Sequence, residues 1–354
     1  MHWLVRHQRL TLLTSFALAI GGLGLSSRQE AQSAAARVDE ADAIVQTLVK
    51  SLTPEQKAKL IIPWDQTPKN LAPGMPYFRV ETAKPIALRQ FVRFTPGADR
   101  EGMRLMELTD AQQALVEKYV DATMSVYGAD QARRTMDQEA RNKKSRKDYF
   151  VTLMGDPAGK YVFRLWEHHL TISTGKTESE LEILPNLLGS HGGWEPKVTW
   201  VAEEKVAVEL WKSLTDEQKK VHYVACETKS DQVPFPAAFQ GELVEKLSPG
   251  QQAVTQRLFS ERVRAYKPWM KARTDAIIKA HGGLGKLKLA FTGDASATCE
   301  EAGNRFAWKL TGSKFHMEFS SFPTAMKDRA KPEGNGTVGD EHTHATLIGE
   351  LPAK

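Results

Sequence analysis

Hydrophobic and polar residues follow two periods along the chain, and the helical period comes with a repeated start signal. Four segments combine a leucine, a serine or threonine, and a glutamine three residues after that hydroxyl: 52–56, 108–112, 214–218 and 247–251. Each matches a capping box, in which the hydroxyl and the glutamine satisfy free amides of the first helical turn. The pattern predicts four helices. Apolar spacing extends the second from Thr109 to Met124 and the fourth from Ser248 towards Ile277, ending at His281.

A period of two predicts strands between and after these helices. The first predicted β-hairpin covers residues 149–154 and 161–173, around a turn at 155–159. The second covers 286–292, a turn and loop from Gly293, then 305–310 and 315–319. Residues 340–348 also alternate, which predicts a strand near the carboxyl end.

The two hairpins can be laid over each other, with 164–165 and 170–172 matching 309–310 and 315–317. Two capping boxes precede each hairpin, so an internal duplication is the favoured interpretation. Helix pairs followed by strands predict an α+β fold, with both hairpins joined in one antiparallel sheet. We expect a single domain over residues 35–354, built from pseudo-equivalent halves of about 38–202 and 203–354.

The first 34 residues have the pattern of an export signal. Arg6 and Arg9 precede an apolar run at 10–25, and small residues around Ala34 offer a cleavage context. Three glycines interrupt the run, which is shorter than the roughly 20 residues of a membrane span. We expect export to the periplasm or the extracellular space, with membrane association only if the signal is retained.

Composition excludes some classes of function. The 354 residues include 48 Lys and Arg against 43 Asp and Glu, and the net charge of +5 is too thinly spread for a nucleic-acid surface. A G-x-S-x-G nucleophile elbow and a C-x-x-C pair are both absent from the sequence. Cys226 and Cys299 fit either one disulfide or two buried thiols. The expected partner is a small-molecule ligand or substrate.

Histidines carry the candidate chemistry. His342 and His344 lie two residues apart on a predicted strand, so they project from one face about 7 Å apart, a spacing that suits one metal. His168 and His169 are adjacent on a predicted strand and point to opposite faces, so only one can join unless a bulge re-aims the other. We expect a shared metal to require ring nitrogens within about 6 Å of one another.

Two glutamates complete the candidate site as ligand or general base. Glu318 shares a predicted strand face with His316, and Glu167 precedes the histidine pair. Imidazoles with a carboxylate suit a divalent transition metal, namely zinc, copper or iron. The alternative to a metal site is that the histidines form ordinary hydrogen bonds on strands.

Three blocks of this sequence resemble an uncharacterised bacterial family, domain of unknown function 3500. They are residues 166–172 with the double histidine, 315–319 around Glu318, and the His-x-His of 342–344. This chain departs from the family pattern at Glu167, Ser320 and Glu341, where the family commonly has Gly, Asp and Asn. The resemblance implies an exported protein with a shared polar constellation and does not supply a reaction.

These observations favour an exported protein with a histidine-rich metal site. A metal-dependent hydrolase or oxidoreductase would use the metal to activate water or an oxidant. The alternative is a non-catalytic extracytoplasmic module that binds a ligand or has a structural role.

Overall fold

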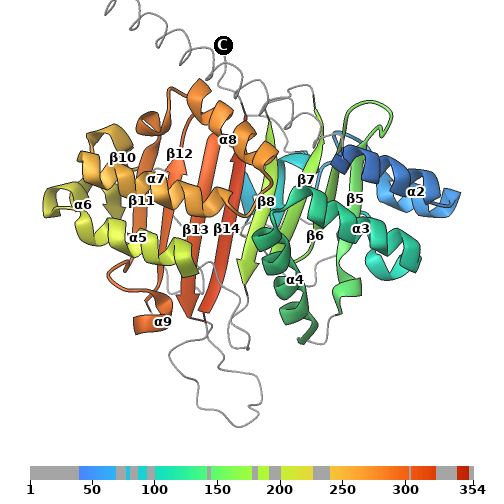
Figure 1. Ribbon diagram of the computed structural model, residues 1–354, viewed down its shortest axis with the longest axis horizontal. Helices are drawn as coiled ribbons and strands as arrows, with labels where there is room; N and C mark the ends of the chain where they lie inside the picture. Colours follow the sequence, from blue (N-terminus) through green and yellow to red (C-terminus); the bar gives the residue numbers. More distant parts are fainter. Residues whose placement is uncertain are drawn as a thin grey trace, which may run out of the picture.

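A computed structural model describes residues 40–68, 77–79, 87–93, 100–141, 145–177, 182–190, 201–225, 240–302, 304–323 and 341–350 (Figure 1). The predicted export segment and Cys226 lie outside these ranges. Within the part of the chain so described, none of the helices has the length and apolar character that a membrane span needs.

The fold is built on one 12-stranded sheet, most of it antiparallel. Its strands are β1 (Ile61–Ile62), β4 (Met103–Arg104), β5 (Phe150–Gly155), β6 (Tyr161–Trp166), β7 (Leu170–Lys176), β8 (Ile183–Ser190), β9 (Tyr223–Val224), β10 (Glu242–Leu243), β11 (Lys288–Gly293), β12 (Phe306–Thr311), β13 (Phe315–Pro323) and β14 (Glu341–Gly349). The main path runs β1-β5-β6-β7-β8-β14-β13-β12-β11-β10, so β8 and β14 join the two predicted hairpins at the centre of the sheet.

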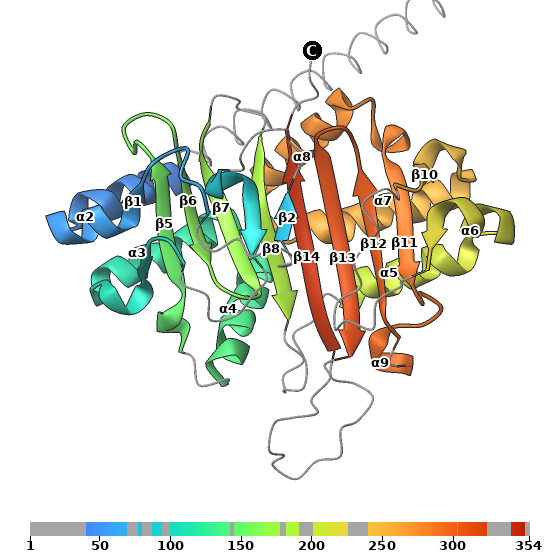
Figure 2. The ribbon, with the colours of Figure 1, turned by 180° about the vertical axis from the view of Figure 1, so that it is seen from behind.

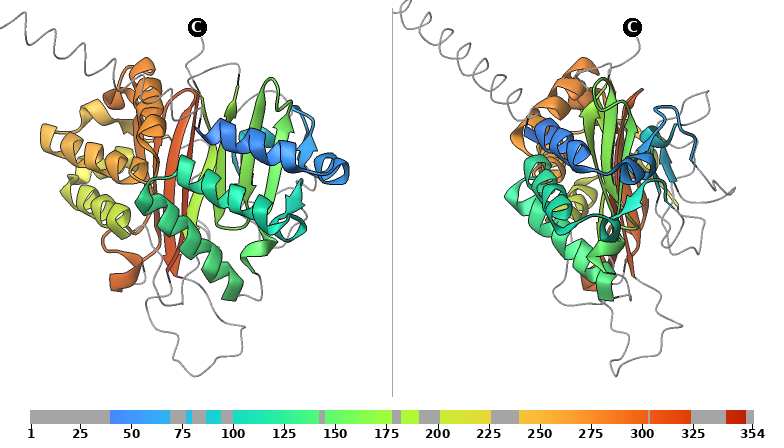
Figure 3. Two further views of the ribbon diagram at one scale, coloured as in Figure 1. Left: turned by 45° about the vertical axis from the view of Figure 1, so that its right-hand side comes forward. Right: turned by 90° about the vertical axis from the view of Figure 1, so that its right-hand side faces the viewer.

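Helices cover one face of this sheet (Figures 1 and 3). They are residues 40–51, α2 (Pro54–Leu60), α3 (Asp110–Thr123), α4 (Val126–Arg141), α5 (Val201–Ser213), α6 (Asp216–His222), α7 (Pro249–Val263), α8 (Pro268–Ala280) and the short α9 (Cys299–Ala302). The opposite face carries a small sheet of β2 (Tyr77–Arg79) and β3 (Phe91–Arg93), seen in front of the central strands in Figure 2. The predicted α+β class is confirmed.

All four predicted capping boxes are present, and their glutamine side chains also hydrogen-bond to one another in pairs, which the motif does not predict. The Gln56 and Gln112 amides hydrogen-bond to each other in both directions, at 3.0–3.1 Å, and Gln218 and Gln251 do the same at 2.8–2.9 Å. Each pair therefore ties the start of one helix to the start of another.

One predicted helix is wrong. The helix that begins after Ser248 stops at Val263, and α8 starts separately with Pro268 at its first position. Proline has no amide hydrogen and clashes with the preceding turn of a helix, so it interrupts a continuous helix but fits a helix start. The predicted end at His281 is confirmed, because Gly282 and Gly283 follow with φ of 92° and close the last turn.

Hydrophobic cores lie on both faces of the sheet. The largest lies under the helices and contains Leu165, Ile172, Leu188, Phe319 and Leu347. Two smaller ones lie on the other face, where Leu88 covers Trp166 and Leu184, and Val92 covers Leu187 and Ile348. Alternating strand residues therefore enter different cores, as period-two patterning requires.

The two ends of the sheet have similar connections. β5 pairs with β1 in parallel and with β4 antiparallel, and β11 pairs with β9 and β10 in the same two ways. The internal duplication of the sequence stays a prediction.

Candidate metal centre

The double histidine lies in a tight turn rather than on a strand. β6 ends at Trp166 and β7 begins at Leu170, which leaves three residues between them. The Glu167 amide donates to the Leu170 carbonyl at 2.8 Å, and the Gly189 amide of β8 donates to the His169 carbonyl at 2.8 Å. The predicted strand through 161–173 is wrong here, because the backbone reverses at 167–169.

This turn removes the expected conflict between the two histidines. Alternation on one strand would place His168 with Trp166 and Ile172 on the same face, but Trp166 and Ile172 enter cores on opposite faces. In a turn, neighbouring side chains need not point apart, and the rings of His168 and His169 lie with centroids 3.7 Å apart. Both histidines therefore reach the same group.

The other two histidines come from β14, as the sequence predicts. Ala345 and Leu347 of this strand enter the core under the helices, so His342 and His344 project from the opposite face. His344 pairs across the sheet with Gly189, which has no side chain and leaves room for the turn. A Cβ at Gly189 would lie 3.2 Å from Cδ2 of His169 and 2.6 Å from the Thr343 carbonyl oxygen.

The four histidines form one compact group. One ring nitrogen from each of His168, His169, His342 and His344 lies within 4.8 Å of the others. Nε2 of His342 is 2.7 Å from Nε2 of His169 and 3.1 Å from Nε2 of His344. Bonds near 2.0–2.1 Å place neighbouring nitrogens of a tetrahedral site about 3.4 Å apart, so these separations are close to a ligand set.

His168 stands slightly apart within the group. Its ring centroid is 6.0 Å from that of His342 and 6.4 Å from that of His344, whereas the His169 centroid is 4.5 and 5.3 Å away. His168, His169 and His344 are buried and His342 is half-buried. Phe322, paired with His342 across the strands, stacks on its ring at 4.6 Å. The group is therefore largely shielded from solvent.

Glu167 does not belong to this group of ligand atoms. Its carboxylate accepts a hydrogen bond from the His168 backbone amide and lies 3.6 Å from a guanidinium nitrogen of Arg100. Both charged side chains are buried. Sequence reasoning missed Arg100 because nothing local relates it to a turn 67 positions later.

Glu318 also lies outside the group. It shares a strand face with His316, as expected, and its Oε2 is 3.0 Å from Nε2 of His316. Across the strands it pairs with Lys309 on one side and Thr346 on the other. Burial lowers the pKa of His316, and the Glu318 carboxylate opposes that shift. Burial likewise lowers the pKa of Lys309. A catalytic role for Glu318 or Glu167 stays a prediction.

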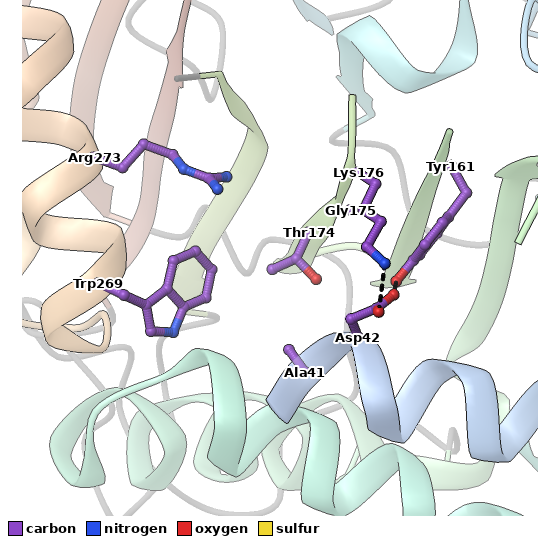
Figure 4. Close-up of a pocket in the computed structure, with 8 residues that line it drawn as sticks. All are labelled: Ala41, Asp42, Tyr161, Thr174, Gly175, Lys176, Trp269 and Arg273. Atoms are coloured by element: carbon purple, nitrogen blue, oxygen red, sulfur yellow. Dashed lines mark hydrogen bonds and ion pairs between the residues drawn. The ribbon is translucent and has the colours of Figure 1, made fainter. Parts of the chain in front are cut away.

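A second polar site lies on the helical side, between residues 40–51, α8 and strands β6 and β7 (Figure 4). Asp42 binds Lys176 at 2.7 Å and accepts from the hydroxyl of Tyr161. Burial acts to raise the pKa of Asp42, but these hydrogen bonds outweigh it and hold the pKa below its usual value. Asp42 and Lys176 neutralise each other, and the guanidinium of Arg273 donates to the Glu182 carbonyl at 3.2 Å. This pocket is therefore a weaker candidate than the histidine group.

His222, His281 and Cys299 do not belong to the histidine group. His222 and His281 end helices α6 and α8, and their ring nitrogens contact the carbonyls of Leu289 and Glu350. Cys299 is buried in α9. His191, a weak further ligand candidate in the sequence, and residues 327–339, whose glycines and proline predict a loop, lie outside the described residues.

The family to which the chain belongs follows from a comparison with family models. A family model described as "Protein of unknown function (DUF3500)" matches residues 79–347, and the protein belongs to that family. The match includes all four clustered histidines. No curated protein and no solved structure matches the chain.

Proposed function

We propose that the protein is a metalloprotein whose histidine group binds one divalent transition metal. The observation that carries this proposal is the position of Nε2 of His342, in contact with Nε2 of both His169 and His344. A neutral imidazole nitrogen has either one proton to donate or one lone pair to accept with. It can satisfy one of these contacts as a hydrogen bond, but not both. A cation that takes the lone pairs of all three nitrogens removes the conflict.

The types of ligand atom limit which metals the site can bind. Imidazoles suit zinc, copper and iron, whereas calcium and magnesium prefer oxygen ligands. Within the described residues the group contains no thiolate and no carboxylate. We therefore propose zinc, copper or iron.

The distances between the rings favour three ligands and one neighbour among the four histidines. His169, His342 and His344 converge through Nε2, while His168 is farther from the β14 histidines. Three protein ligands and one exchangeable position are typical of catalytic metals. A metal held in this way lowers the pKa of a bound water or binds an oxidant. The His168 ring, whose centroid lies 3.7 Å from that of His169, would hold or transfer a proton in a metal-dependent hydrolase or oxidoreductase acting on a small molecule.

Four imidazoles also suit a second candidate function. A closed set of four protein ligands is typical of structural metals, and it favours a non-catalytic binding module. The variant His168→Ala separates the two. The catalytic proposal expects this variant to keep its metal, and the structural one expects it to lose it.

Metal analysis of the purified protein tests the proposal itself. The apoprotein is reconstituted separately with zinc, copper(II) and iron(II), and bound metal is measured after desalting. We expect about one equivalent in the wild type and background in His342→Ala/His344→Ala. His316→Ala is the matched control, because it removes a histidine from the same sheet face outside the group. Equal background metal in the folded wild type and the double variant would refute the proposal.

Export is a separate part of the proposal, supported by the pattern of the first 34 residues. Fractionation of cells that express the full chain, with amino-terminal sequencing, tests it. We expect a periplasmic or secreted product that begins near Ala35. A full-length product in the cytosol would contradict export without affecting the metal proposal.

A further inference from the structure

We propose that the buried pair of Arg100 and Glu167 is the positioning element of the histidine group, and that it fixes the turn that presents His168 and His169. This inference rests on the proposed metal centre. It gives Glu167 a role through its neighbours, not as a ligand.

Both oxygens of Glu167 have partners that shape the turn. Oε1 lies 3.6 Å from Nη1 of Arg100, and Oε2 accepts from the backbone amide of His168. The Glu167 amide in turn donates to the Leu170 carbonyl at 2.8 Å. The backbone of Glu167 therefore closes the three-residue turn, and its side chain holds the middle residue, His168. Carboxylate acceptors make stronger hydrogen bonds than neutral ones, so this restraint is a firm one.

Arg100 is held in place by the sheet itself. Its guanidinium lies over the Trp166 ring, 5.2 Å from the centroid. The Trp166 indole donates to Oγ1 of Thr152 at 2.9 Å, and the Thr152 hydroxyl donates to the Glu101 carbonyl. The chain next to Arg100 is thus tied to the strand β5, which neighbours β6.

A glycine allows this close approach. Gly102 has a φ of 103°, and a Cβ there would lie 2.2 Å from the Val151 carbonyl oxygen and 2.4 Å from Oγ1 of Thr152. Only glycine adopts this backbone without strain or clash. The segment that carries Arg100 is therefore packed directly on β5.

Burial makes the pair sensitive to change. The side chains of Arg100 and Glu167 are 0% and 4% exposed. Removing one partner of a buried pair leaves an uncompensated charge in a medium that solvates it poorly. The turn is expected to shift in response, and residues that orient metal ligands typically change metal affinity by about 10–100-fold when mutated.

A second buried pair provides a matched control. Arg262 of α7 and Glu203 of α5 are 0% and 2% exposed, and their carboxylate and guanidinium are hydrogen-bonded. Glu203→Gln removes the same charge from the same kind of pair, but under the helices. It separates a general loss of stability from a specific effect on the histidine group.

The test compares Glu167→Gln with Glu203→Gln in the purified protein. Affinity for copper(II) is measured by competition with a chelator, and the ligand-field spectrum of the copper form reports the geometry. Thermal unfolding of the apoproteins reports stability. We expect Glu167→Gln to weaken copper binding by about tenfold or more and to shift the spectrum. Glu203→Gln should lower only the unfolding temperature.

A conservative variant keeps the inference testable if Glu167→Gln does not fold. Arg100→Lys retains a cation for Glu167, and Arg100→Met does not. We expect copper affinity in Arg100→Lys to lie closer to the wild type than in Arg100→Met. Copper affinity within twofold of wild type in folded Glu167→Gln, or in folded Arg100→Met, would overturn the inference. So would an equal loss in Glu203→Gln. A wild type that binds no metal would instead refute the proposed function.

Discussion

Two turns of this sheet share a backbone arrangement and differ in chemistry. The β6–β7 turn and the β12–β13 turn each contain three residues, 167–169 and 312–314. In each, the first turn residue donates to the carbonyl three positions later, at 2.8 Å in both. In each, the last turn residue accepts from an amide at the end of a central strand, Gly189 in one case and Glu350 just after β14 in the other.

The side chains of the two turns differ in burial. His168 and His169 are buried against β14 and meet two more histidines. Ser313 is exposed, and Lys314 is half-buried with its ammonium 3.2 Å from a carboxylate oxygen of Glu350. The same backbone frame therefore supports either a candidate metal site or an ordinary surface connection. What differs is the residue types in the turn and what the adjacent strand offers to them.

The largest expected difference between the two turns is in metal affinity, and removing an imidazole from the first turn tests it. His169→Gln keeps an amide that can hydrogen-bond but lacks the imidazole that suits these metals. We expect metal affinity to fall by more than about 100-fold, because even residues that only orient ligands cost up to that much. Chelator competition measures it, with Ser313→Ala in the second turn as the control. Equal affinities in the two variants would remove the distinction between the turns.

The second largest effect is expected when the space at Gly189, beside the first turn, is filled. The variant Gly189→Ala places a methyl group 2.6 Å from a backbone oxygen and 3.2 Å from His169. Overpacking of this kind costs about 1–3 kcal/mol, and we expect unfolding in urea to show it together with weaker metal binding. Gly250→Ala is the control, because its added methyl group meets nothing within 4 Å. A neutral Gly189→Ala would mean that the turn does not need this approach.

Beyond the second turn, β13 carries a histidine whose effect should depend on pH. Burial lowers the pKa of His316 in the folded protein, below the value of about 6.5 of an unfolded chain. Above that pH the ring is neutral in both states, and its contribution to stability is fully present. As the pH falls, the unfolded chain takes up a proton first, so stability decreases down to the folded pKa. We expect urea unfolding at pH 5–7.5 to show a smaller pH dependence in His316→Gln than in the wild type. An unchanged slope would contradict this.

The smallest effect is expected from the surface pair of the second turn. Lys314 and Glu350 are 38% and 26% exposed, and such pairs contribute at most about 1 kcal/mol. Lys314→Ala should therefore change the unfolding free energy by less than that and leave metal affinity unchanged. A loss of metal affinity in this variant would show that the two turns are coupled through the sheet.

Local patterns predicted some of this molecule well. The four capping boxes are confirmed because a cap depends on residues three positions apart, and the shared face of His342 and His344 follows from the period of a strand. The turn at 167–169 was missed because Glu-His-His contains no glycine, proline or asparagine to mark a reversal. The Arg100–Glu167 pair depends on tertiary packing, which periodicity does not report.

The central claim concerns three nitrogens around one metal. Anomalous diffraction from crystals of the metal-loaded protein, recorded at the absorption edge of that metal, tests it most directly. We expect one peak within about 2.0–2.2 Å of Nε2 of His169, His342 and His344. Metal-loaded crystals without a peak at these histidines, or with the peak elsewhere in the molecule, would contradict the account.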